Sequence, residues 1–138
     1  SGTVKRCKSK ADIVTFAEIM AKAYDMPTDW APFLAQILEP TLTVLGFEHH
    51  LAFIKDIPVG TLTLMRHKQY VTIGSAGVLS EFRGTRTIYN MAVEVLHGAK
   101  RTGVDTVVAQ TSLGPKFERY LRISGFKLAF RRTEYKLA

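Results

Sequence analysis

Phosphate-binding chemistry is concentrated in the segment between residues 78 and 88. The segment leads from an apolar strand end through a basic turn into a helix, in the order Val78, Leu79, Ser80, Glu81, Phe82, Arg83, Gly84, Thr85, Arg86, Thr87 and Ile88. A helix start offers unpaired backbone N–H groups and a partial positive charge to an anion. Arg83 and Arg86 add planar donor groups that match phosphate oxygens. The segment therefore predicts a nucleotide-like ligand, and a basic helix start that is only solvated surface is the alternative.

The length and composition predict one compact α/β domain over residues 1–138. A hydrophobic content of 46% with 22% charged residues is typical of a globular protein. We find no apolar run of the roughly 20 residues that a bilayer span needs, and no signal-peptide pattern. The single cysteine, Cys7, excludes an internal disulfide, is interpreted as an ordinary strand residue and fits a reducing cytoplasm. One interpretation of the opening Ser1-Gly2, which lacks a methionine, is a cloning scar.

Hydrophobic periodicity predicts the elements that must position residues 78–88. Strands are expected at residues 3–8, 51–55, 61–66, 70–78, 106–110 and 126–135, with a hairpin turn at residues 56–60. The first helix is expected to begin at a capping box of Ser9 and Asp12, to carry Tyr24 in its apolar stripe and to end before Pro27. The second follows the cap Thr28 and ends at Pro40, and its Trp30 and Phe33 are interpreted as helix packing, with the wall of an acceptor pocket as the alternative. A short helix is expected at residues 115–124. The clearest helix lies before Gly103 and carries an apolar stripe of Ile88, Met91, Ala92, Val95, Leu96 and Ala99. The order β-α-α-β-β-β-α-β-α-β describes a mixed sheet with helices on its faces.

Two glycines weaken the strand expected at residues 70–78. Gly74 and Gly77 both fall inside it. A glycine within a strand often marks a bulge or the close approach of another backbone or a ligand. We therefore expect an irregularity just before the phosphate-binding segment.

This order of elements resembles the GNAT superfamily of acyl-CoA-dependent N-acyltransferases. Three segments carry the resemblance: residues 81–84 entering the amphipathic helix, the hairpin turn at residues 56–60, and residues 119–126 before the last strand. The likeness spans nearly the whole chain, is best between Tyr70 and Leu137, and is topological before Ala52. It implies a mixed, mostly antiparallel sheet flanked by helices.

The resemblance also implies a reaction, acetyl transfer from acetyl-CoA to a primary amine. The diphosphate of the coenzyme would lie on the turn and helix start, formed by Arg83, Gly84, Thr85, Arg86, Thr87 and Ile88. The pantetheine arm would pair with the strand that ends at Val78 and Leu79, which would splay from the strand at residues 106–110. A deprotonated amine attacks the thioester directly, a backbone N–H stabilises the oxyanion, and an acid protonates the departing thiolate.

The sequence departs from the family pattern at the turn and at the acid. Two positions that are commonly small residues are Arg86 and Ile88, and Ile88 is better explained by the apolar helix stripe. Many members carry a tyrosine where this chain has Leu121, which makes the neighbouring Tyr120 the candidate acid. One residue rotates a helical side chain by about 100°, so Tyr120 reaches the thioester only if its helix is shifted or turned.

No general base stands out. Glu48, His49, His50 and His67 are candidates, because an amine needs a proton acceptor whose pKa lies near the working pH. His49 and His50 are adjacent and point to opposite faces of a strand, so they cannot bind a metal together, and surface or packing roles are favoured. The sequence has no Cys/His cluster that would predict a metal site.

The formal net charge of +7 favours a polyanionic partner, and +6 of it falls after residue 99. We expect a cytoplasmic acetyltransferase that acts on an amine of a small molecule, a peptide or a modified base. A catalytically silent acyl-CoA-binding domain and a nucleic-acid-binding or base-modifying protein are the alternatives, although no RNA-binding or helix-turn-helix motif is visible. A homodimer is left open, and no membrane partner is expected.

Overall fold

The computed structural model describes residues 2–109. They form β1 (Gly2–Arg6), α1 (Lys10–Ala23), η1 (Thr28–Trp30), α2 (Ala31–Leu38), η2 (Glu39–Thr43), β2 (Phe47–Ile54), β3 (Ile57–His67), β4 (Tyr70–Val78), η3 (Ser80–Phe82), α3 (Arg86–Arg101) and β5 (Thr106–Ala109). The order agrees with the sequence prediction as far as residue 109. The helix predicted at residues 115–124 and the strand predicted at residues 126–135 lie outside the described residues.

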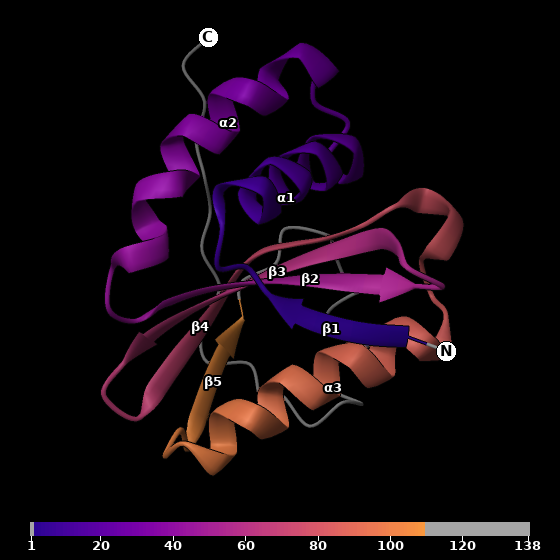
Figure 1. The fold of residues 1–138 in the computed structure, drawn as a ribbon. Helices are drawn as coiled ribbons and strands as arrows, with labels where there is room; N and C mark the ends of the chain where they lie inside the picture. Colours follow the sequence, from indigo (N-terminus) through magenta and orange to yellow (C-terminus); the bar gives the residue numbers. More distant parts are fainter. Residues whose placement is uncertain (1, 110–138) are drawn as a thin grey trace, which may run out of the picture.

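The strands form one sheet in the order β1-β2-β3-β4-β5. The first three pairings are antiparallel, and β4 pairs with β5 in parallel over Tyr70–Ile73. The predicted mixed, mostly antiparallel sheet is therefore confirmed. Helices α1 and α2 lie on one face and α3 on the other (Figure 1).

Two apolar clusters hold these layers together. On the α1 face, Phe16 and Ile13 of α1 are fully buried and pack with Leu51 of β2, together with Cys7 and Ala35 of α2. On the α3 face, Leu64 of β3 and Val71 of β4 pack with Ala99, Val104 and the partly buried Val95 and Leu96 of α3. The alternation of side chains along β2 to β4 supplies both clusters, as expected for a sheet covered on both faces.

The hairpin between β2 and β3 is tighter than the sequence predicted. Its turn consists of Lys55 and Asp56 alone, both with positive φ (51° and 63°), which matches a two-residue turn of type I′. Pro58 belongs to β3 and lies opposite Phe53, where the register shifts. A proline lacks the N–H that the ladder needs, but it is tolerated at such an irregularity, so residues 57–60 extend the strand.

The start of α2 also differs from the prediction. Thr28 does not cap the helix, because residues 28–30 form the short turn η1 and no side-chain cap bond is present at either η1 or α2. Pro40 does not end the helical path, which continues through η2 to Thr43.

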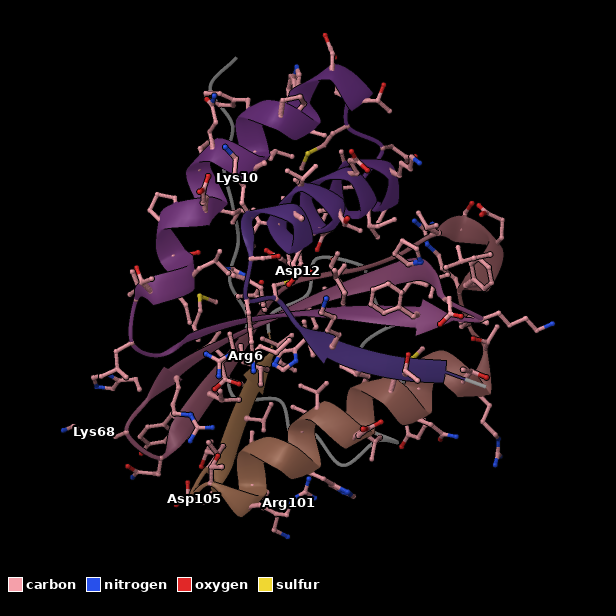
Figure 2. All side chains as sticks on the ribbon, viewed as in Figure 1. Arg6, Lys10, Asp12, Lys68, Arg101 and Asp105 are labelled. Carbon is pink, nitrogen blue, oxygen red and sulfur yellow. The ribbon has the colours of Figure 1, made fainter. Side chains whose placement is uncertain are left out.

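The C-terminal end of α3 is fixed to the sheet. Gly103 has φ of 98° and stops the helix, as predicted. The Arg66 guanidinium of β3 donates to the Thr102 carbonyl at 3.1 Å and to its hydroxyl at 2.6 Å, and the Asp105 amide donates to the Gln69 carbonyl at 3.0 Å. Figure 2 shows Lys68, Asp105 and Arg101 at this end of the molecule.

Within residues 2–109, none of the helices has the length and apolar character needed to cross a membrane.

Candidate active site

The last half of β4 contains a bulge. Thr61 of β3 lies opposite Gly77 and Thr63 lies opposite Gly74, so two β4 residues, Ser75 and Ala76, face a single β3 residue. Ser75 has φ of 47°, and its carbonyl accepts a hydrogen bond of 2.7 Å from the Thr61 hydroxyl. The irregularity predicted from the two glycines is present, and a buried threonine hydroxyl holds it.

The end of α1 lies directly against this bulge. The Tyr24 hydroxyl donates to the Ala76 carbonyl at 2.7 Å. A Cβ atom on Gly77 would approach the Ala23 Cβ to 2.8 Å, which is too close, so only glycine allows the strand and the helix to meet here. Burial raises the pKa of Tyr24 above its ordinary value, which keeps the phenol a donor.

Arg83 ties the same strand end to α1. Its Nε donates to the Val78 carbonyl at 3.0 Å, and its Nη2 donates to the Ala23 carbonyl at 2.8 Å. A cation at the last carbonyls of a helix is favourable because the helix dipole is negative there. Two of the five N–H groups of the guanidinium are used in this way. The predicted phosphate contact of Arg83 stays a prediction, but the structure gives this side chain a structural role that the sequence did not indicate.

The start of α3 carries the remaining residues of the predicted phosphate site. Gly84 has φ of 75° and open space around it, so this turn needs glycine for its backbone conformation and not for close packing. The Thr85 hydroxyl donates to the Phe82 carbonyl at 3.0 Å, and α3 begins at the next residue, Arg86. Its first turn has no acidic residue. The helix start therefore combines backbone N–H groups with positive charge, which is the combination that an anion requires.

The backbone at the end of β4 is partly engaged by the protein itself. The Leu79 amide donates to the Val59 carbonyl of β3 at 2.9 Å. Because backbone groups alternate in direction along a strand, those of Val78 point away from β3. The Val78 carbonyl is the one that accepts from Arg83. Of the predicted pantetheine contacts, Val78 thus has the orientation that pairing with a ligand needs.

Parallel pairing at β4 stops before the bulge. The paired residues are Tyr70–Ile73 of β4 and Thr106–Ala109 of β5. Within the described residues, β4 from Gly74 to Val78 has only β3 as a registered partner. The bulge and the end of β4 therefore have one edge without a registered strand partner among the described residues, and the chain leads from there into the start of α3.

His49 is a packing residue and is not placed to accept a proton from a substrate. It is 2% exposed, and its ring contacts Phe16 edge-on at a centroid distance of 5.1 Å. Thr41 Oγ1 donates to the Leu38 carbonyl, so it accepts from Nε2 of His49 at 2.7 Å, and Nδ1 accepts from the Thr63 hydroxyl at 2.8 Å. Burial, then the nearby His50 and Arg6, lowers the pKa of His49, which favours the neutral ring that this pattern of hydrogen bonds requires.

The other candidate bases lie on β2 or at the last position of β3, and none is on β4. His50 occupies the opposite face of β2 from His49, with Nε2 3.4 Å from Oε1 of Glu48, while Glu48 also lies 3.7 Å from Arg66. Burial lowers the pKa of His50, and the adjacent Glu48 carboxylate opposes this shift. His67 is exposed at the last position of β3. The expected opposite orientation of the two histidines is confirmed, and none of these groups adjoins the end of β4.

The candidate acid lies beyond the described part of the chain. Tyr120 and the neighbouring Leu121 both fall after residue 109, and their roles remain predictions. Among residues 2–109, no group of three or more His, Cys, Asp and Glu side chains could hold a metal ion.

Sequence reasoning missed Tyr24 and Thr61, which fix the bulge. Tyr24 was assigned to the helix stripe, and Thr61 was simply a strand residue. Gly77, adjacent to Ala76 whose carbonyl accepts from Tyr24, was the only available signal, since it marked a close approach without identifying the partner.

Comparison with known proteins identifies the fold. No protein-family model matches the sequence, and no curated protein matches it. Solved structures match along the full chain. An acetyltransferase of Trypanosoma brucei superposes with a TM-score of 0.76 at 16% identity, covering 99% of this chain and all of the other.

Two further structures show how widely this fold is shared. AAC(6')-Iy, in complex with the bisubstrate analogue CoA-S-monomethyl-acetylneamine, has a TM-score of 0.75 at 13% identity, covering 100% of this chain and 99% of its own. A transcriptional regulator from Bacillus halodurans has a TM-score of 0.75 at 15% identity, covering 99% of this chain and all of its own. A protein assigned to the GNAT family from Desulfovibrio desulfuricans also matches, with a TM-score of 0.73 at 16% identity. The chain therefore has the fold that these acetyltransferases share.

Proposed function

We propose that this chain is an N-acetyltransferase that moves the acetyl group of acetyl-CoA to a primary amine. The observation that carries the proposal is the succession of three features along the chain: a bulged strand end, a basic turn with glycine at φ of 75°, and a helix start whose first turn has no acidic residue. A long ligand fits these three features if its diphosphate binds at the turn and helix start and its amide-containing arm pairs with the strand end. The matching fold of several acetyltransferases supports the same assignment.

Each part of this run has a proposed role. The backbone N–H groups of Arg83, Gly84, Thr85, Arg86, Thr87 and Ile88 bind the diphosphate, assisted by the guanidinium groups of the two arginines. The backbone of Val78 and Leu79 binds the pantetheine arm, mainly through Val78, because the Leu79 amide is bonded to β3. The ties from Tyr24 and Arg83 hold the strand end in place before a ligand arrives, which reduces the entropy cost of binding.

The proposed reaction is a direct transfer. The neutral amine attacks the thioester carbonyl, a C–N bond forms, and the C–S bond breaks as the oxyanion collapses. The amine proton passes to solvent or to a base, and Tyr120 gives its proton to the thiolate, so free coenzyme A is released. A backbone N–H at the bulged end of β4 would stabilise the oxyanion.

Coenzyme binding and turnover are tested separately. Acetyl-CoA binding is measured by calorimetry, and release of free thiol is followed with a panel of primary amines. We expect binding and amine-dependent thiol release, with Tyr120→Phe lowering turnover about a hundredfold while binding is retained, as for loss of a general acid. Full turnover in Tyr120→Phe would remove this residue from the mechanism.

The same measurements distinguish the alternative functions. Acetyl-CoA binding without thiol release for any amine would indicate a silent acyl-CoA-binding domain. Salt-sensitive binding of duplex or single-stranded nucleic acid that acetyl-CoA does not affect would indicate a nucleic-acid-binding protein instead.

A further inference from the structure

Helix α2 exposes a large apolar face. Trp30, Phe33 and Ile37 follow one another at i, i+3 and i+7, so they form one stripe along η1 and α2. Their exposed fractions are 53%, 63% and 54%. Isolated exposed apolar residues are ordinary, but three large ones in a stripe are typical of a contact surface.

The fold uses only one side of this helix. Ala31 and Ala35 are buried, and Leu34 and Leu38 pack against the cluster that contains Phe16. Figure 1 shows α2 alongside α1 on the same face of the sheet. The helix is therefore apolar over a wider arc than its packing against α1 requires, and the stripe of Trp30, Phe33 and Ile37 is the part that remains uncovered.

The charge of this region is opposite to that of the rest of the chain. No lysine or arginine occurs between Lys22 and Lys55, whereas that interval contains Asp25, Asp29, Glu39 and Glu48. The interval therefore carries −4, and because the whole chain carries +7, the remainder carries +11. Asp29 stands four residues before Phe33, on the same side of the helical turn.

Two of these acids have no ion pair within the described structure. Asp25 and Asp29 are exposed, and neither makes a salt bridge with another residue among positions 2–109. Their charge is thus available to a cation that approaches the stripe. A stripe of this composition repels nucleic acid, and it lacks the Lys and Arg that a helix at an anionic lipid surface carries.

The stripe begins a short way along the chain from one residue of the candidate active site. Tyr24, whose hydroxyl donates a hydrogen bond to the β4 bulge, is the C-cap residue of α1 and precedes Trp30 by six residues. A molecule held on the stripe therefore has to extend past Tyr24 for its amine to reach the β4 bulge.

We propose that the surface formed by Trp30, Phe33 and Ile37 with Asp25 and Asp29 binds a cationic peptide segment that contains apolar side chains and supplies the acceptor amine. The proposal rests on the acetyltransferase function proposed above and names its acceptor class. A peptide fits better than a small amine, because the stripe runs along about two turns of helix, roughly 10 Å, and a small polar amine would leave it uncovered.

Binding is tested with a probe that cannot react. A short peptide of alternating leucine and arginine, with a blocked N-terminus and a fluorescent C-terminal label, is titrated with the protein and followed by anisotropy. We expect Ile37→Ser to weaken binding about tenfold, since it removes one buried apolar contact. Ile57→Ser is the matched control, because Ile57 is 56% exposed on the β2–β3 hairpin, and we expect it to leave binding unchanged.

The acidic contribution is tested in the same way. Asp29→Asn should weaken binding about threefold and reduce the dependence on salt, whereas Glu94→Gln on exposed α3 should do neither. With the same peptide carrying a free N-terminus, Ile37→Ser should lower acetylation in proportion to binding and leave acetylation of a small amine unchanged.

The outcomes separate this proposal from the function on which it rests. Peptide binding that depends on Ile37 and Asp29 without any acetylation would leave the peptide surface intact and contradict the transferase. Acetylation of amines with peptide binding insensitive to both substitutions would overturn the peptide surface alone. A mass that falls from dimer to monomer in Ile37→Ser, with no peptide binding, would also overturn it, because the occupant would be a second copy of the chain.

Discussion

Helices α1 and α3 begin with similar residues and differ at the position that supplies the acidic residue of α1. Residues 9–12 and residues 85–88 each begin with a hydroxyl residue and a cation, followed by Ala11 in α1 and by Thr87 in α3. The fourth residue is Asp12 in α1 and Ile88 in α3. The difference at this fourth position separates a helix start that the chain satisfies with its own carboxylate from one that has none in its first turn.

The start of α1 is closed by its own anion. The Asp12 carboxylate accepts from the Ser9 and Lys8 amides at 3.2 and 2.9 Å, and the Ser9 hydroxyl accepts from the Asp12 amide at 3.1 Å. Lys5 completes the arrangement with an ion pair of 2.8 Å. The hydrogen bond from Lys5, followed by that from the Lys8 amide, lowers the pKa of Asp12 to about 2. At the start of α1 the chain's own carboxylate accepts hydrogen bonds from the backbone amides. At the start of α3 the first turn has no acidic residue to do so, and an external anion can bind there.

Giving α3 an acid of its own should have the largest effect. Aspartate is as good an N-cap residue as threonine, so Thr85→Asp should keep the helix while placing a negative charge where the diphosphate would bind. We expect the affinity for coenzyme A to fall at least tenfold, measured by calorimetry. Thr85→Asn is the neutral control, and an equal loss in both variants would show that the charge of this helix start is irrelevant.

Arg83 tests whether the basic turn is structural or ligand-binding. Arg83→Ala removes the bonds to the Ala23 and Val78 carbonyls, and we expect unfolding in urea to show a loss of about 1–2 kcal/mol. Arg83→Lys keeps the charge but cannot reach both carbonyls with a planar fork. If the tie matters most, both variants lose stability. If only phosphate binding matters, Arg83→Lys keeps stability and affinity alike.

Removing the acid from α1 should affect stability without affecting the ligand. Asp12→Asn should lower the free energy of unfolding by about 1 kcal/mol, since it weakens the bonds that the carboxylate accepts from the Ser9 and Lys8 amides and removes the ion pair with Lys5. Affinity for coenzyme A should not change, and Asp25→Asn serves as an exposed control. A loss of coenzyme affinity in Asp12→Asn would show that the two helix starts are not independent.

The same carboxylate gives a pH signature. The pKa of Asp12 is depressed in the folded chain, so its stabilising contribution is complete above the unfolded value of 3.8 and is lost as the pH falls toward about 2. Asp12→Asn should reduce the pH dependence of the unfolding free energy in that range of pH. An unchanged slope would mean that neither the Lys5 contact nor the amide bonds to the Asp12 carboxylate persist in solution.

Periodicity made most of the fold predictable from sequence. The strand at residues 70–78 and the stop at Gly103 are confirmed, because each depends on local pattern and on one special residue. The capping box of α1 was also predicted, since Ser9 and Asp12 lie at the required spacing. The hairpin turn was not, because Pro58 and Gly60 looked like turn residues and belong to a strand with a register shift.

The candidate site was predictable only in part, because its organisation depends on distant contacts. Residues 78–88 could be found from residue types alone. The contact of Arg83 with Ala23 spans 60 positions, and that of Tyr24 with Ala76 spans 52, so no local pattern reveals either. The exposed stripe on α2 was likewise assigned to packing, because helical spacing does not show which half of an apolar arc is covered.

Arg86 should give the smallest effect and the sharpest check on the α3 start. It is the first residue of α3 and is exposed, so Arg86→Ala should leave the unfolding free energy within about 0.5 kcal/mol. Its charge adds to that of the helix dipole, and its loss should weaken coenzyme A binding about threefold at low salt and less at high salt. Lys10, the first residue of α1, offers the matched substitution, because Lys10→Ala removes the same charge from a helix start that Asp12 already closes. A salt-dependent loss for Arg86→Ala alone would locate the anion at α3, whereas equal losses would reduce the effect to net charge.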